Sequence, residues 1–219
     1  MSGSLRSAEP VASPRARRAP SFAPTIAFQG TFGAFGEMAA LARWPEGEPR
    51  PMPTFERVVA SVAAGISDLG LIPVWNSILG EIPFTRNVLD DAQIEVTGEI
   101  SVPIELCLLA RPKVSLGSIA YVGSHPAALA QCRRFFTEHP ELTPCPAWDT
   151  AGAARDLVEG NATYSWHERL PGAAPRTIAA IASAAAAERY GLVVLQRAIQ
   201  DVAENVTRFA IVERTGGAL

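Results

Sequence analysis

The apolar and polar positions of this chain fall into short blocks that predict strands followed by helices. Apolar runs of four to six residues are typical of buried strands, and apolar positions at three- and four-residue spacing are typical of one helix face. The predicted strands are Thr25–Phe28, Leu69–Val74, Ile119–Val122, Ile178–Ala182 and Thr207–Val212, with one or two more within Ile94–Leu109. The predicted helices are Ala34–Arg43, Phe55–Gly65, one from Ser124 through Phe136, one that begins at Asp149-Thr150, and Ala184–Tyr190 with Gly191 as its C-cap.

This alternation predicts an α/β fold with mostly parallel sheets. Several predicted strands end in Gly or Pro and small polar residues, and a helix then begins. In open α/β sheets, ligands bind beyond the carboxyl ends of strands, where helix N-termini present free N–H groups to anions. We therefore expect a small anionic ligand in a cleft between two α/β lobes. The turns concerned are Gln29-Gly30-Thr31, Asn76-Ser77, Ser124-His125 and Asp149-Thr150.

Composition and charge narrow the class of protein. Residues 1–24 are rich in Ser, Pro, Ala and Arg, which predicts a disordered tail because so little apolar surface cannot offset the cost of ordering. The net charge of −3 over 219 residues offers no basic face to nucleic acid. No apolar run approaches the ~20 residues of a membrane span, and we expect neither a membrane partner nor a signal peptide. The three cysteines have neither metal nor disulfide spacing, which favours the reducing cytoplasm.

Candidate chemistry lies in the segment Asn205–Phe209, Asn-Val-Thr-Arg-Phe. The Thr207 hydroxyl can donate a hydrogen bond, and the Arg208 guanidinium can bind a carboxylate through two parallel hydrogen bonds. The sequence Thr-Arg-Phe is also found at the start of ordinary strands, where it has no catalytic role. His125 sits at a predicted helix start, which favours a structural role over a general base. Asp90-Asp91 lacks a third ligand, so no metal site is expected.

Several motifs together resemble the catalytic domain of prephenate dehydratases over residues 25–214. The opening motif resembles Tyr-Gln-Gly…Gly-Ala-Tyr-Ser, the second Pro-Ile-Glu-Asn-Ser, and the third Ser-His-Pro-Gln-Ala-Leu-Ala-Gln-Cys. Each motif alone is common, and their combination in the family's order is specific. The matching segments are Phe28-Gln29-Gly30 with Gly33-Ala34-Phe35, Pro73–Ser77, Ser124–Cys132, Asp149–Ala154, Ala179–Ser183 and Asn205–Phe209.

The resemblance implies a fold of two lobes similar to type 2 periplasmic binding proteins, with the active site in the cleft between them. One lobe would hold residues 25–101 plus 195–214, and the other residues 102–194. The implied reaction is loss of CO2 and water from prephenate to give phenylpyruvate, a step of phenylalanine biosynthesis, without a metal or organic cofactor. The implied assembly is a homodimer or homotetramer. Nothing here resembles the family's C-terminal phenylalanine-sensing ACT domain, so phenylalanine is not expected to inhibit allosterically.

The resemblance also implies roles for individual residues. Thr207 would assist the departing hydroxyl group, and Arg208 with nearby helix N-termini would hold carboxylate. Catalysis would come mainly from positioning and preorganised donors. The residues expected to contact substrate are Gln29, Trp75, Asn76, Ser77, Ser124, Gln131, Thr150 and Phe209.

Three positions near the expected cleft are less polar than the family pattern. Trp75 replaces Glu, Gly36 replaces Ser, and Ala127 replaces Gln, while residues 161–175 resemble an insertion. Trp75 either packs into the core or creates a drier pocket with a changed substrate or product. Three alternatives to a prephenate dehydratase therefore stay open. They are a prephenate decarboxylase that leaves the ring non-aromatic, an arogenate dehydratase, and a non-catalytic module that binds small anions.

Overall fold

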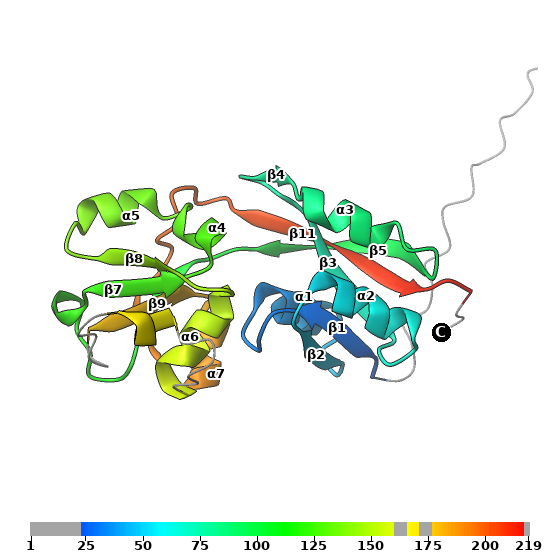
Figure 1. The fold of residues 1–219 in the computed structure, drawn as a ribbon, viewed down its shortest axis with the longest axis horizontal. Helices are drawn as coiled ribbons and strands as arrows, with labels where there is room; N and C mark the ends of the chain where they lie inside the picture. Colours follow the sequence, from blue (N-terminus) through cyan, green and yellow to red (C-terminus); the bar gives the residue numbers. More distant parts are fainter. Residues whose placement is uncertain (1–22, 160–165, 171–176, 217–219) are drawn as a thin grey trace, which may run out of the picture.

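The computed structural model describes residues 23–159, 166–170 and 177–216, which form two lobes, each built on a β-sheet with helices beside it (Figure 1). The sheet of the first lobe has the order β2-β1-β3-β11-β5, with β4 paired to β3. The strands of this sheet are β1 (Thr25–Gln29), β2 (Glu48–Met52), β3 (Leu69–Asn76), β4 (Gly80–Glu81), β5 (Ile94–Pro103) and β11 (Val206–Arg214). Its helices are α1 (Phe35–Arg43), α2 (Phe55–Ala63) and α3 (Pro83–Leu89).

The second lobe holds the other sheet, in the order β10-β6-β9-β7-β8. Its strands are β6 (Cys107–Ala110), β7 (Tyr121–Ser124), β8 (Thr143–Pro146), β9 (Ile178–Ala182) and β10 (Val193–Gln196). Its helices are α4 (Pro126–Leu129), α5 (Arg133–Glu138), α6 (Thr150–Glu159) and α7 (Ala184–Tyr190), with the short 3-10 segments η1 (Leu116–Ser118) and η2 (Trp166–Arg169).

The α/β class is confirmed, but the prediction of mostly parallel sheets is wrong. Strand β1 pairs in parallel with β2 and β3, and β7 pairs in parallel with β8 and β9. The other pairings among the described strands are antiparallel, because β11 returns from the second lobe between β3 and β5, and β6 runs against both its neighbours. The first sheet is therefore mixed because of β11, and the second sheet is mixed because of β6.

Two missed strands share one cause. Strand β2 reads Glu-Pro-Arg-Pro-Met and β8 reads Thr-Pro-Cys-Pro, and each lies at an edge of its sheet. Proline cannot donate a ladder hydrogen bond, so it is tolerated at edges and weakens any strand pattern in the sequence.

The predicted helix from Ser124 through Phe136 is two helices. Asp201 supplies the reason, because its carboxylate accepts hydrogen bonds from the backbone N–H groups of Arg133 and Arg134, at 3.1 and 2.9 Å. Its own N–H donates to the Gln131 carbonyl at 2.6 Å. This capping starts a new helix after Gln131 and leaves the Gln131 side chain free to face the space between the lobes.

Two segments cross between the lobes, one from β5 to β6 and one from β10 to β11 (Figure 1). They bond to each other, since the N–H of Ile104 donates to the Asn205 carbonyl at 2.7 Å. One buried cluster runs through the crossing and joins Leu71 of the first sheet to Leu108 of the second. Strand β10 belongs to the second sheet as far as Gln196, two residues beyond the boundary predicted at 194. Most of the predicted tail and of the segment 161–175 lies outside the described residues.

Candidate active site

A cleft of about 790 Å³ lies between the lobes and is lined by residues from both. Its floor on the first lobe is the β3–β11 pair, and its opposite wall is formed by the starts of α4 and α6. Six of the ten predicted site residues line it: Gln29, Asn76, Gln131, Thr150, Thr207 and Phe209.

A β-bulge decides which side chains of β3 face the cleft. Thr207 pairs with Asn76 and Arg208 with Trp75, but Phe209 pairs with Pro73, so Val74 is an extra residue on β3. Successive strand residues point to opposite faces, and a bulge shifts that alternation by one. Pro73 and Asn76 therefore both line the cleft, while Trp75 does not.

Thr207 is held by Asn76 in a way that leaves its proton available. The Asn76 Nδ2 group donates to Thr207 Oγ1 at 3.0 Å and to Asn205 Oδ1 at 2.8 Å. The Asn76 Oδ1 atom accepts from the N–H groups of Ile78 and Leu79, which fixes the orientation of the amide. Because Thr207 Oγ1 accepts a hydrogen bond and no acceptor for its proton is found within the described chain, the hydroxyl can donate into the cleft.

Asn205 extends this network to the second lobe. Its Nδ2 group donates to Gln131 Oε1 at 2.6 Å, so Asn76, Asn205 and Gln131 form a chain across the cleft floor. Gln131 itself lines the cleft. Asn205 is 2% exposed and positions the other two residues without lining the cleft itself.

Arg208 and Trp75 correct the sequence prediction, because the structure places both on the other face of the sheet. Neither lines the cleft. The Arg208 guanidinium carbon lies 4.5 Å from the centre of the Trp75 ring, and its NH1 group bonds Glu99 Oε2 at 3.2 Å. In this arrangement Arg208 does not reach a carboxylate bound in the cleft, and Trp75 neither dries nor fills the pocket.

Ser77 and Ser124 are also absent from the cleft lining. The Ser124 hydroxyl is fully buried and donates to the Ile181 carbonyl at 2.7 Å, which ties β7 to β9. The Ser77 hydroxyl donates to the Glu204 carbonyl at 3.1 Å and accepts from the Val206 N–H at 2.9 Å. Both hydroxyl groups hold the backbone beside the site.

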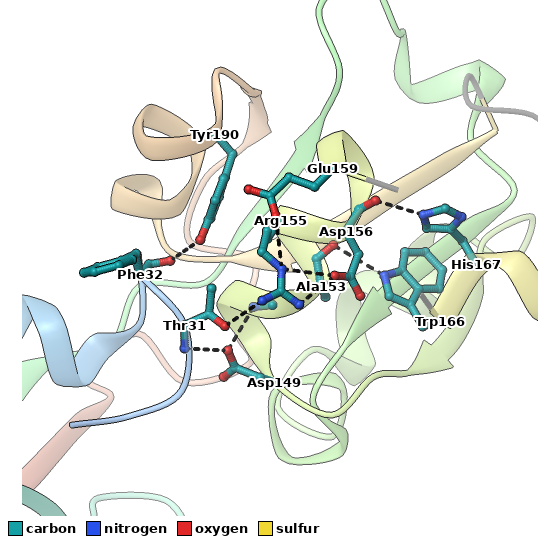
Figure 2. Close-up of polar contacts among 11 residues, drawn as sticks. Thr31, Phe32, Asp149, Ala153, Arg155, Asp156, Glu159, Trp166, His167 and Tyr190 are labelled. Atoms are coloured by element: carbon teal, nitrogen blue, oxygen red, sulfur yellow. Dashed lines mark hydrogen bonds and ion pairs between the residues drawn. The ribbon is translucent and has the colours of Figure 1, made fainter. Parts of the chain in front are cut away.

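The sequence prediction did not place Asp149 and Ser183 in the site, although both belong to matching motifs and both line the cleft. The Asp149 Oδ2 atom accepts from the Gly152 N–H at 2.9 Å, which caps α6, and from the Thr31 N–H at 3.1 Å across the lobes (Figure 2). Burial raises the pKa of Asp149, while these N–H groups oppose that rise. The Ser183 hydroxyl donates to the Gly33 carbonyl at 2.7 Å.

Asp149 and Ser183 therefore dock the Gly-rich turn of the first lobe onto the second lobe. The turn needs glycine at residue 33, which has φ +88° and where a Cβ atom would lie 2.7 Å from the backbone of Ala186. Gly33 can therefore approach α7 this closely only because it has no side chain.

The described side chains that line the cleft include no Arg or Lys, and three of them are carboxyl groups: Glu56, Glu81 and Asp149. His125 also lines it, and burial lowers its pKa, which favours the neutral ring. Its Nδ1 atom accepts from the Ala127 N–H at 3.2 Å and caps α4, in agreement with a structural role.

Backbone N–H groups are then the donors for an anion. Helix α1 begins in the cleft wall, and its N-cap residue, Ala34, makes no side-chain cap, so the first N–H groups of α1 are not capped by a side chain there. Helix α6 also begins in the wall, at Thr150, but the Asp149 carboxylate already accepts from its first turn. Over residues 23–159, 166–170 and 177–216, no three His, Cys, Asp or Glu side chains are grouped so as to hold a metal ion, and no helix has the length and apolar character of a membrane span.

Comparison with known proteins agrees with the motifs. A sequence model of prephenate dehydratase matches residues 26–216. Arogenate dehydratase 1 of Petunia hybrida is 38% identical over 190 residues, which are 86% of this chain and 42% of the relative. A bifunctional N-acyl-homoserine lactone acylase/prephenate dehydratase of Komagataeibacter europaeus is 34% identical over 89% of this chain and 64% of its own length.

A solved structure supports the same assignment. Prephenate dehydratase from Arthrobacter aurescens in complex with L-Phe superposes with a TM-score of 0.74 at 32% identity, covering 89% of this chain and 61% of that one. The chain spans less than half the length of the plant dehydratases it matches. The sequence match over nearly all described residues and the shared fold lead to one conclusion: the chain belongs to the prephenate dehydratase family.

Proposed function

We propose that this protein is a lyase that removes CO2 and water from prephenate and releases phenylpyruvate. The observation that carries the proposal is the Thr207 hydroxyl, which lines a cleft between two lobes and accepts a hydrogen bond from Asn76. When the ring carboxylate leaves as CO2, its electron pair enters the ring, the double bonds shift, and the hydroxyl on the opposite carbon is expelled. Thr207 donates a proton to that hydroxyl, which departs as water, and regains one from solvent.

The protein contributes positioning and preorganised donors, because the ring becomes aromatic and the reaction is driven by the substrate. A carboxylate of prephenate is held by the N-terminus of α1, which has no side-chain cap, whereas Asp149 already caps α6; no Arg or Lys side chain lines the described cleft. Phe209, which is 5% exposed and lines the cleft, supplies an apolar surface for the ring.

Arogenate is a second candidate substrate, and the charge of the cleft favours it. Arogenate carries an ammonium group where prephenate carries a keto group. Glu56, Glu81 and Asp149 line the cleft, and carboxylates attract an ammonium group. The kcat/KM values for the two substrates decide between them. A higher value for arogenate selects an arogenate dehydratase, and a higher value for prephenate retains the first proposal.

Product analysis separates dehydration from the other open alternatives. Gly36 and Ala127 line the cleft where the family has Ser and Gln, so the loss of two polar groups is real at this site. Incubation with prephenate should give phenylpyruvate, detected by its ultraviolet absorption. A decarboxylated keto acid that is not aromatic would identify a non-aromatising decarboxylase. Binding of prephenate without turnover would identify a small-anion binding module and overturn the proposed activity.

We also propose a compartment and an assembly for this protein. The three cysteines are free and buried, which supports a reducing compartment such as the cytoplasm. We propose a homodimer or homotetramer, as the family resemblance implies. Light scattering of the purified chain gives the mass directly, and a monomer at micromolar concentration would refute the assembly.

A further inference from the structure

A second pocket, of about 360 Å³, lies behind the Gly-rich turn. Gln29, Gly33 and Ala34 of this turn line the cleft, whereas the residues between them, 30–32, line the second pocket. Its walls are the end of β2 from the first lobe and parts of α6 and α7 from the second. The pocket therefore exists only where the two lobes meet.

The second pocket is cationic, in contrast to the cleft. Arg155 and Arg189 line it, with Glu159 as the single carboxylate among its described lining. The Arg189 side chain lies over the Phe32 ring, 4.4 Å from its centre, and forms no ion pair with any residue in the described chain. A guanidinium that is stacked but unpaired is free to bind an anion.

Arg155 is held in place by hydrogen bonds to two neighbouring side chains. Its NH2 group bonds Asp156 Oδ1 at 3.0 Å, and its NH1 group bonds Thr31 Oγ1 at 3.4 Å (Figure 2). Asp156 is fully buried and its Oδ2 atom has no partner, so this carboxylate depends on Arg155 for its compensation. The pair with buried Asp156 fixes the half-buried Arg155 guanidinium at the pocket wall, and Arg189 is the exposed cation of the pocket.

Flat apolar side chains surround these cations. Phe32, Trp148 and Tyr190 line the pocket, and the Tyr190 hydroxyl donates to the Phe32 carbonyl at 2.8 Å, which joins α7 to the turn. Aromatic walls favour an aromatic ring in offset or edge-on contact. We propose that this pocket is a binding site for a small aromatic carboxylate, with its charge at Arg189 and its ring against Trp148.

The site is coupled to the cleft. Trp148 and Pro53 line both cavities, and the Thr31 N–H that flanks the pocket is bonded to Asp149 in the cleft wall. A ligand that touches both lobes stabilises the arrangement in which they meet, and so does a substrate held between them. Each ligand must then raise the affinity for the other by the same factor, which for coupled sites is roughly 5-fold or more.

Calorimetric titration with benzoate tests the site without requiring catalysis. Benzoate should bind the wild-type chain, and Arg189→Gln should weaken it about tenfold or more, because the unpaired charge is lost. Arg189→Lys should give an intermediate loss, since the charge stays and the planar stack goes. Arg43→Gln is the matched control, because Arg43 is also exposed and stacked on an aromatic ring, Trp44, but lines neither cavity. It should leave the affinity unchanged.

Three results would overturn the proposal. Absence of benzoate binding would remove the site, and equal affinity in wild type and Arg189→Gln would place benzoate in the cleft, which Arg189 does not line. Acetate binding as tight as benzoate binding would refute the aromatic class. Thermal unfolding of each variant confirms the fold, and Arg189 is exposed, so its replacement should leave the melting temperature nearly unchanged. With turnover established, benzoate should lower KM in wild type and lose this effect in Arg189→Gln.

Discussion

The two faces of the β3–β11 pair do different work, although one short motif supplies both. On the cleft face, Thr207 is buried and hydrogen-bonded to Asn76, and Phe209 is buried beside them. On the other face, Arg208 lies against Trp75 and pairs with Glu99, with 41% of the Arg208 side chain exposed. Chemistry is concentrated on the first face, and the second supports the sheet.

This difference shows why neighbours in a motif need not be neighbours in a site. Consecutive residues of a strand point to opposite faces, so the hydroxyl of Thr207 and the guanidinium of Arg208 cannot meet at one substrate carboxylate. The bulge at Val74 adds a second effect. Without it, Trp75 would share the face of Pro73, and Asn76 would turn away from Thr207.

The same geometry accounts for the departure at Trp75. Trp75 stands directly opposite Arg208 in the antiparallel register. A Glu there, as in the family pattern, would be placed for a cross-strand ion pair. Here the indole face receives the guanidinium at 4.5 Å, and Glu99 on β5 supplies the negative charge at 3.2 Å. The change from Glu to Trp75 therefore replaces one partner of Arg208 with another and leaves the side chains of the cleft face unchanged.

Removing the hydroxyl from the cleft face should have the largest effect. Thr207→Val keeps the branched shape of the side chain but deletes the proton donor, and we expect kcat to fall on the order of 10²-fold or more. Steady-state kinetics with prephenate and arogenate measure the loss. Thr207→Ser, which keeps a hydroxyl, should recover most of the activity. Turnover near wild type in a folded Thr207→Val variant would remove Thr207 from the mechanism.

Asn76→Ala should follow, with both kinetic and structural consequences. It leaves Thr207 without its orienting donor and the N–H groups of Ile78 and Leu79 without their acceptor. Loss of a buried hydrogen-bonded group costs about 1–3 kcal/mol, and we expect kcat to fall roughly tenfold or more. Denaturant unfolding and kinetics give the two numbers separately. Asn87→Ala, at an exposed position on α3, is the control and should change neither.

Much of the fold is visible in the sequence because local signals and tertiary structure agree there. Strand Ile178–Ala182 and helix Ala184–Tyr190 have the predicted bounds, and Gly191 ends the helix with a left-handed φ of 63°. The helix break after Gln131 could not be predicted, because its cause, Asp201, is 67 or 68 residues away from the N–H groups it caps.

The site residues also divide into those that the sequence predicts and those that it does not. Thr207, Asn76 and Gln131 carry the motif's polar chemistry and do line the cleft. The roles of Asp149 and Ser183 depend on contacts between lobes, with Thr31 and Gly33, which no periodicity within one segment reveals. Arg208 is misplaced because it directly follows Thr207 on a strand and therefore points to the opposite face. Trp75 is misplaced because a bulge is defined by the register of the partner strand and leaves no mark on hydrophobic alternation.

On the second face, Arg208→Gln should have a much smaller effect on catalysis than either change on the first. We expect KM within about threefold of wild type, and a stability loss of about 1 kcal/mol from the lost ring contact and the exposed ion pair. Substrate-saturation curves and thermal unfolding measure these. A tenfold rise in KM, with the fold intact, would show that Arg208 reaches the substrate in a conformation other than this one.

Trp75→Glu should give the smallest effect and is the sharpest test of the two-face comparison. The new carboxylate would face Arg208 and add a cross-strand ion pair of about 0.2–1 kcal/mol, while the lost cation–π contact is worth about 0.5–1 kcal/mol. It would also lie near Glu99, which already binds Arg208, and like charges oppose each other. The net change in the free energy of unfolding should therefore be small, and less unfavourable when Glu99→Gln is added.

Products and the ratio of kcat/KM for prephenate and arogenate should stay within about twofold of wild type, since no cleft atom changes. Trp75→Phe, which keeps a flat ring under the guanidinium, is the control for packing. A tenfold shift of the substrate ratio in Trp75→Glu but not in Trp75→Phe would mean that charge on the second face reaches the cleft, and the two faces would have to be treated as one site.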